Sequence, residues 1–466
     1  MSTVPQVSEA MQWVLNDYPR LIERETNFVQ RSTAKLNGAT FVSGLVLTWM
    51  AAPDASYSQL RNSIATMGVN VKAQAVEQRF GPESVKLFQE VFKEAVKQVI
   101  CAQASVPELF ARFNGVYNQD SSVVPLPAFM AKSYPGCGGK GPEAGVSSMR
   151  IEVRWDLSQG GMSGPWITSG REAEHQGAAR EEHLPAGSLF CGDGNYFTLK
   201  SMRRRGEADT FWLTPAKANL NFYDAQGVRR DLVSYLQSHE GMQVIDTQIQ
   251  AGLSDRLPCR LIAVHLNREQ RRMKTSETVY LPASSKGIQV CGPKKGKKGE
   301  KKKKKSRKKT TKISKSRQQV SDWIFLLTNV PVEKLSAEEA LVLMRCRWQI
   351  ELLWKLWKQH GKIDTWRSEK PERVETEIYA KLLGLLIEHW ITLLGCWEDP
   401  TRSLRKAQQM TQWNASALAF ALIGEMSLSR TIQRITEAMS NGCRINPRRK
   451  KPNTYQLVRD PKLINS

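Results

Sequence analysis

The sequence predicts a mixed α/β protein in which helical N-terminal and C-terminal segments enclose strands, and a β-rich region interrupts the middle of the chain. Residues 1–115 carry helical patterns and little strand signal, short alternating runs begin near residue 114, and long apolar helical runs follow residue 375. The chain has 466 residues, of which 41% are hydrophobic and 24% charged. It is therefore long enough to bury more than one core.

The charge distribution indicates a polyanionic partner, which is either nucleic acid or an anionic membrane surface. The formal net charge is +23, and Lys294–Arg317 contributes +14 of it through fifteen Lys or Arg residues and Glu300. No apolar residue lies between Lys294 and Lys312, so this segment is predicted to be a disordered loop that binds phosphate without sequence choice. A solvated linker is the alternative interpretation.

Cysteine spacing and hydropathy indicate a reduced, cytoplasmic protein without a membrane span. The eight Cys form no C-x2-C pair, the six His add no zinc spacing, and the N-terminus has no apolar signal segment. The most apolar long stretch, Tyr379–Trp397, contains Lys381, Glu388 and His389, which favours a buried helix. A location in the cytoplasm of a prokaryote, associated with the nucleoid, is expected.

Two short helical patterns around a glycine turn resemble a helix-turn-helix. The first is predicted to be capped by Ser58 and to end at Gly68, and the second spans Val71–Phe80. A plain helical hairpin is the alternative. The polar face that would read DNA consists of Lys72, Gln74, Gln78 and Arg79.

Two predicted strands of the middle region are each followed by, or end at, an acidic residue. The first, V-Y-N-Q-D, is predicted to end at Asp120, before small polar residues and prolines. The fourth, S-L-F-C, leads into Asp193, before a helix to Arg205. Asp156 lies inside its own strand and has no comparable position. The elements between the two acids are predicted as a Gly-rich loop at Pro135–Gly145, strands at Met149–Leu157 and Pro165–Ser169, and a helix at Arg171–Glu182.

A helix over Met344–Lys358 brings an acid and two bases to one side. At 100° per residue, Arg347, Glu351 and Lys358 fall within about 40° of one another. A carboxylate flanked by cations suits a metal ion beside a polyanion. An ordinary amphipathic helix with i,i+4 pairing is the alternative. A second side of the same helix is apolar and suited to packing in a core; it consists of Leu343, Cys346, Ile350, Leu353 and Trp357.

The order R-x3-E-x6-K inside R-W-Q-I-E closely resembles the Y-R-E-K signature of DDE transposases, and more narrowly that of the insertion sequence 4 family. Met344 stands where that signature has Tyr. Asp120, in Q-D-S-S, resembles the first Asp of these enzymes. Asp193, in D-G-N-Y-F, resembles the second, with Asn195 inserted between the Gly and the Tyr.

The resemblance implies an RNase H-like catalytic core, in which Asp120, Asp193 and Glu351 hold two Mg²⁺ ions, with Mn²⁺ able to substitute. It also implies that a Trp stacks against a flipped base near the cleavage point, and Trp323 is the candidate, with Ile324 as the alternative position. The residues expected to bind DNA near the acids are Arg347, Lys355 and Lys358.

The expected function is cut-and-paste transposition: metal-dependent cleavage of double-stranded DNA at terminal inverted repeats, followed by strand transfer into target DNA, with a homodimer on paired ends. A nuclease without strand transfer and a catalytically inactive DNA-binding repressor are the alternatives. The predicted layout is a DNA-binding domain at 1–115, core at 116–205, a β-rich insertion at 206–321 with the Lys-rich loop 294–317, core at 322–400, and a helical C-terminal region with a basic tail at 401–466.

Overall fold

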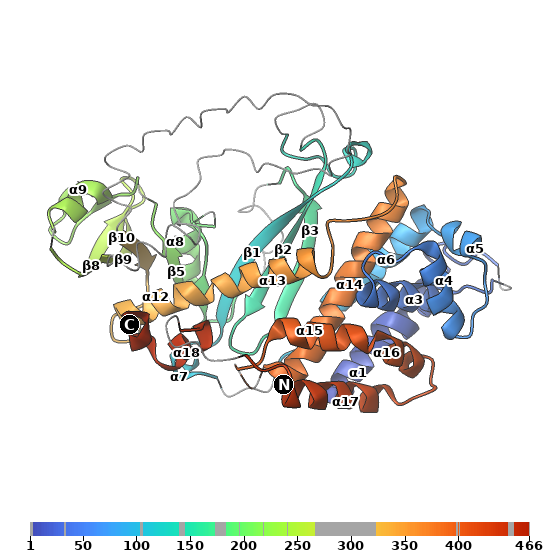
Figure 1. The fold of residues 1–466 in the computed structure, drawn as a ribbon. Helices are drawn as coiled ribbons and strands as arrows, with labels where there is room; N and C mark the ends of the chain where they lie inside the picture. The colour runs from blue at the N-terminus through green and yellow to red at the C-terminus, as the bar shows by residue number, and fades with distance from the viewer. Residues whose placement is uncertain are drawn as a thin grey trace, which may run out of the picture.

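The computed structural model describes residues 3–465 except for 32–33, 103–105, 139–144, 173–182, 195, 218, 240, 266–322, 398, 400 and 446–451. The Lys-rich loop, most of the helix predicted at Arg171–Glu182 and the centre of the Gly-rich loop therefore lie outside the described residues. Within them, a long mixed sheet forms one side of the molecule and a helical body the other (Figure 1).

The N-terminal part is helical, as the sequence predicts. Its α-helices are α1 (Val4–Gln12), α2 (Tyr18–Ile22), α3 (Gly38–Ala51), α4 (Tyr57–Thr66), α5 (Ala73–Glu77), α6 (Pro82–Val96) and α7 (Glu108–Ala111). The predicted cap at Ser58 is wrong, because α4 begins two residues earlier at a capping box between Ser56 and Gln59. The second helix, α5, is also shorter than the sequence predicts, with five residues.

Ten strands form one sheet in the order β3-β2-β1-β4-β5-β10-β9-β8-β6-β7. β1, β4 and β5 are parallel to one another, and the other neighbouring strands pair antiparallel. The strands are β1 (Val116–Pro125), β2 (Ser148–Asp156), β3 (Met162–Ser169), β4 (Leu189–Cys191), β5 (Phe211–Pro215), β6 (Asn221–Tyr223), β7 (Arg229–Asp231), β8 (Val244–Ala251), β9 (Leu257–His265) and β10 (Trp323–Thr328).

The predicted boundary at 205/206 does not coincide with a break in the sheet. β5, which the sequence places in the insertion, pairs with β4, and β10 then pairs with β5. Residues 211–265 therefore extend the core sheet instead of leaving it. Two helices flank this extension, α8 (Leu199–Glu207) and α9 (Leu232–Gln237), and a second apolar cluster that includes Phe190, Trp212 and Leu261 lies under them.

β1 is longer than predicted, because it continues for five residues beyond Asp120. Ser121–Pro125 remains paired with β2, up to the Pro125–Ser148 pair. Asp120 therefore lies in the middle of a strand, opposite Val153. Small residues and a proline suggest a loop, but the long antiparallel partner supplies hydrogen bonds that keep them extended.

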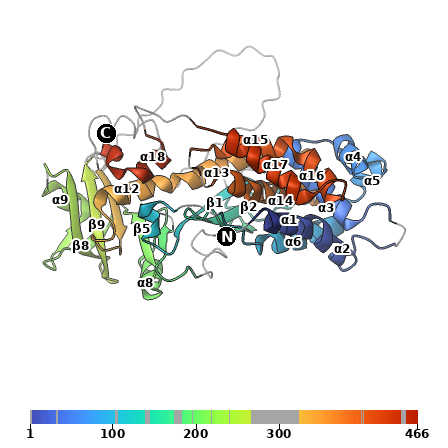
Figure 2. The same ribbon diagram turned by 90° about the horizontal axis from the view of Figure 1, so that it is seen from below.

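The predicted helix over Met344–Lys358 is two helices, α12 (Ala337–Cys346) and α13 (Trp348–Gln359), that meet at Arg347. The Arg347 backbone is still right-handed helical, with φ −52° and ψ −34°. The angular relation between Arg347 and Glu351 is therefore preserved. α13 crosses the face of β1 and β2 in both views (Figures 1 and 2).

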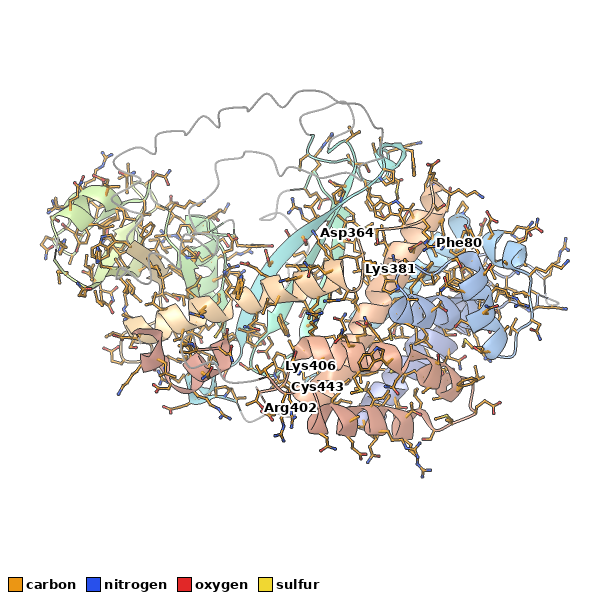
Figure 3. The ribbon with its side chains drawn as sticks, viewed as in Figure 1. Phe80, Asp364, Lys381, Arg402, Lys406 and Cys443 are labelled. Atoms are coloured by element: carbon orange, nitrogen blue, oxygen red, sulfur yellow. The ribbon has the colours of Figure 1, made fainter. Side chains whose placement is uncertain are left out.

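The 26-residue helix α14 (Pro371–Cys396) is the centre of the helical body. It is long and apolar enough to cross a membrane, but 83% of its most apolar window is buried inside the protein. Arg373 stacks on Phe80 at 4.2 Å, and Lys381 donates a 2.7 Å hydrogen bond to the carbonyl of Thr365. Figure 3 shows the labelled Phe80 and Lys381 where α14 meets the N-terminal helices.

The C-terminal helices complete this body. They are α15 (Leu404–Trp413), α16 (Ala415–Leu422), α17 (Leu428–Asn441) and α18 (Thr454–Arg459). α16 and α17 are separate helices, because Gly424 adopts φ +88° between them. α17 packs on both α14 and α1, so helices from the two ends of the chain share one core.

Candidate active site

Two acids follow paired positions of two parallel strands. Asn118 of β1 is paired with Cys191 of β4. Asp120 comes two residues after Asn118, and Asp193 comes two residues after Cys191, so the two acids follow a paired position at the same distance along the chain. Side chains two apart in a strand point to the same face, so Asp120 lies on the face of Asn118, where α13 packs.

Three hydrogen bonds fix α13 along β1, in the direction of the strand. The Asn118 amide donates to the carbonyl of Cys346 at 3.2 Å, just before the helix. The Trp354 indole donates to Oδ2 of Asp120 at 3.1 Å. The Lys358 ammonium donates to the carbonyl of Val123 at 3.0 Å. Glu351 precedes Trp354 by less than one turn of the same helix.

Glu351 is held by a buried arginine. Nη2 of Arg347 donates to its Oε1 at 2.7 Å, and the side chains of Arg347 and Glu351 are 2% and 41% exposed, respectively. Arg347 also lies near β4: burial raises the pKa of the Cys191 thiol, and the positive charge of Arg347 opposes that rise. The i,i+4 pair expected under the plain amphipathic interpretation is thus present, but its arginine faces the interior.

The three carboxylates provide only oxygen donors, the ligands that Mg²⁺ prefers. The described part of the chain holds no group of three His, Cys, Asp or Glu side chains already placed around a common metal position. The hydrogen bond from Trp354 orients Asp120, and that from Arg347 orients Glu351. The donor chemistry therefore fits Mg²⁺.

The two lysines of α13 differ in environment. Burial lowers the pKa of Lys358, and its ammonium is bonded to β1. Lys355 is exposed one turn after Glu351, where a DNA strand can reach it. Of the DNA-binding residues predicted on this helix, Lys355 is the most accessible.

Trp323 begins β10 and is only 7% exposed, with His265 edge-on at 4.9 Å. It belongs to the apolar cluster below β4 and β5, so its indole is not presented to solvent as a stacking surface. Ile324 lies on the other face, against the larger core. A six-residue strand buried on both faces does not reveal from its sequence which side meets a ligand.

The N-terminal residues predicted to read DNA are only partly available. Lys72, Gln74 and Gln78 are not buried and lie on and around α5. Arg79 instead donates a 2.7 Å hydrogen bond to the carbonyl of Phe28 and stacks on its ring at 5.2 Å. Arg79 therefore ties α5 to an earlier segment of the same chain.

Sequence reasoning misses Trp354 and a buried polar group behind β1. Trp354 lies next to the apolar stripe of the helix, so its position gives no sign of a functional role. The neighbouring sequence also does not show that Asp120 lies opposite it. The second group is Gln119, Glu152 and Tyr196, which meet on the far face of the sheet. Asp156, the competing acid, lies at the end of β2, where burial raises its pKa and the Ser158 amide donates to its Oδ1.

Comparisons with known proteins show which family the chain belongs to. A family model described as "Transposase DDE domain" matches residues 120–387, which is more than half of the chain. The transposase for insertion sequence element IS231E of Bacillus thuringiensis subsp. finitimus is 24% identical over 388 residues, covering 78% of this chain and 75% of the relative. The transposase for IS1151 of Clostridium perfringens is 23% identical over 405 residues, covering 81% and 79%.

Proposed function

The chain belongs to the family of proteins with a transposase DDE domain, and from this premise we propose that it is an insertion-sequence transposase. It binds the terminal inverted repeats of its own element, cleaves the DNA there and transfers the freed strands to a target. The two relatives from Bacillus and Clostridium are named as insertion-sequence transposases, which supports the proposal.

One observation supports this function most: Asp120 and Asp193 follow paired positions of two parallel strands, and the helix that is bonded to Asp120 also carries Glu351. The strand order β3-β2-β1-β4-β5, with β1, β4 and β5 parallel, supports an RNase H-like core. The motif R-W-Q-I-E-x6-K supports membership of the insertion sequence 4 group.

Asp120, Asp193 and Glu351 are proposed to hold two Mg²⁺ ions, which Mn²⁺ can replace. When bound, the ions would supply an activated hydroxyl and a stabilised leaving oxygen for displacement at phosphorus. The chain's own residues prepare this site: Trp354 orients Asp120, and Arg347 orients Glu351.

DNA would meet the molecule at two places. Lys355 lies exposed beside Glu351 and suits the phosphates of the cleaved end. Lys72, Gln74 and Gln78 are accessible on and around α5 and suit recognition of the repeat farther inside the element. Pairing two ends requires two copies of the chain, so the DNA-bound form is proposed to be a homodimer.

The decisive test uses a supercoiled plasmid that carries the DNA flanking this gene, incubated with the full chain in Mg²⁺ or Mn²⁺. A transposase yields cleavage at the element ends and strand-transfer products. Cleavage without transfer products would assign a nuclease, and binding without cleavage in either metal would assign a repressor. Asp120→Asn serves as the inactive control.

A further inference from the structure

We propose that Tyr196 is a positioning residue for Asp193, acting through a buried hydrogen-bond chain on the opposite face of the sheet. This inference rests on the proposed function, because it concerns the same acidic site. Tyr196 follows Asp193 by three residues, and its backbone amide donates to the carbonyl of Asp193 at 3.1 Å. This hydrogen bond closes a turn that begins at Asp193 and ends at Tyr196, just after β4.

The far end of this turn is anchored by the Tyr196 side chain. Its hydroxyl donates to Oε1 of Glu152 at 3.0 Å, and Tyr196 and Glu152 are only 7% and 3% exposed. Nε2 of Gln119 donates to the same oxygen at 2.8 Å. A buried polar group costs stability unless it is paired, so this arrangement strongly favours one position for each partner.

The hydrogen-bond chain connects the two acids through the sheet. Gln119 directly precedes Asp120 in β1, and the two side chains point to opposite faces. Gln119 thus joins the strand that carries Asp120 to Glu152, and Tyr196 joins Glu152 to the turn that carries Asp193. The spacing between the acids is then set by β1–β4 pairing on one side and by this chain of hydrogen bonds on the other.

Asp193 lies outside regular secondary structure. β4 has three residues and ends at Cys191, so Asp193 lies beyond the strand. Helix α8 begins only at Leu199, after a cap at Thr198. The aromatic side chain of Tyr196 is therefore the nearest buried anchor on the C-terminal side of Asp193, within the residues that the structure describes.

Tyr196→Phe removes the hydroxyl and keeps the ring in its apolar surroundings. The chain also contains a matched control: the hydroxyl of Tyr134 donates to Oε1 of Glu375 at 2.5 Å, a partly buried Tyr–Glu hydrogen bond of the same kind that joins a loop to α14. Tyr134→Phe therefore makes the same chemical deletion away from the acids.

Two measurements on the full chain test the role. Amide hydrogen exchange in the absence of metal and DNA should become faster in residues 189–198 for Tyr196→Phe, and should stay at the wild-type rate there for Tyr134→Phe. End cleavage should need a higher Mg²⁺ concentration and fall by about tenfold or more for Tyr196→Phe only, the usual effect of losing a residue that orients a metal ligand. Binding of end DNA should be unchanged in both variants.

Unchanged exchange and unchanged Mg²⁺ dependence in Tyr196→Phe would overturn the inference. Equal changes in both variants would also overturn it, because they would show a loss of general stability. Failure of the wild-type chain to cleave in Mg²⁺ or Mn²⁺ would instead reject the proposed function, and the exchange measurement would still report whether Tyr196 holds the turn.

Discussion

The indole nitrogen of Trp354 donates a 3.1 Å hydrogen bond to Oδ2 of Asp120, joining α13 to the middle of β1 across 234 residues of sequence. Hydrogen bonds to charged groups contribute about 1.5–3 kcal/mol, which is more than most neutral ones. This contact places the helix that carries Glu351 against the strand that carries the first acid. It therefore links the stability of the core to the geometry of the site.

Trp354→Phe should lower the free energy of unfolding by about 1.5–3 kcal/mol and reduce Mg²⁺-dependent end cleavage about tenfold, because Asp120 loses its orienting donor. Urea denaturation and cleavage at several Mg²⁺ concentrations check both parts. Trp13→Phe is the matched control, since Trp13 also donates a 3.1 Å bond to a carboxylate, that of Glu94, but among the N-terminal helices. A similar loss of cleavage in both variants would contradict a specific role for Trp354.

Glu351→Gln should abolish metal-dependent cleavage and leave DNA binding largely intact. The glutamine carbonyl can still accept the 2.7 Å bond from Arg347, so α13 keeps its local structure, while the negative charge that a cation needs is lost. Gel-shift binding and cleavage on the same end fragment measure the two effects. Cleavage near the wild-type rate would show that Glu351 is outside the reacting centre.

The three acids stay predictions from the sequence, and the contacts around them could not be predicted. Asp120 and Asp193 follow apolar strand patterns, and Glu351 shares a helix side with Arg347, so local periodicity and motif identify all three. The Trp354–Asp120 contact depends on which face of β1 meets α13. That choice is made by packing between segments far apart in sequence, and no local pattern records it.

Two local details of the structure have a similar origin. Ser56 and Ser58 both fit a helix start, and the hydrogen bonds of Gln59 select the earlier one. Trp323 is a candidate for base stacking because of its place in the sequence, yet the second apolar core extends under its strand and buries it. Both outcomes depend on competition between neighbouring or distant partners.

The Lys294–Arg317 segment lies outside the described residues, and its prediction rests on composition. Deleting it should flatten the dependence of duplex DNA binding on salt, by about 0.9 in log–log slope for each phosphate that the protein no longer neutralises. Replacing its Lys and Arg by Gln at constant length should have the same effect and separates charge from loop length. A slope that stays unchanged in both variants would mean that the segment does not touch DNA.

Glu388 on α14 should make stability depend on pH. Its carboxyl group accepts a 2.6 Å hydrogen bond from Gln408, and burial raises its pKa to about 8. Above its ordinary pKa of 4.5 the unfolded chain is ionised while the folded protein keeps the proton, so the free energy of unfolding falls as pH rises towards 8. Burial lowers the pKa of the neighbouring His389 to about 4, which has the opposite effect below pH 6.5.

Between about pH 6.5 and 8, the effect of Glu388 on stability is therefore no longer opposed by that of His389. Urea unfolding of Glu388→Gln across this window should show a weaker fall in stability than the wild type, because an amide does not ionise. Glu437→Gln is the control, since Glu437 accepts a 2.9 Å bond from Gln433 in an exposed helix pair. If the wild-type and Glu388→Gln curves run parallel, the buried carboxyl does not titrate in this range.

Arg347→Lys distinguishes the two interpretations of the α13 charges. If Arg347 only formed an exposed helix pair with Glu351, lysine would serve equally well and the change would be nearly silent. Its side chain is instead 2% exposed and lies near β4, where a lysine lacks the planar fork of arginine. We expect end cleavage to fall about tenfold or more, equivalent to about 1.4 kcal/mol or more in the activation barrier, with impaired assembly of the end complex. Arg345→Lys is the control: Arg345 is exposed on the preceding turn, so this variant should cleave like the wild type. If Arg347→Lys also cleaves like the wild type, the Arg347–Glu351 pair is an ordinary helix-surface ion pair.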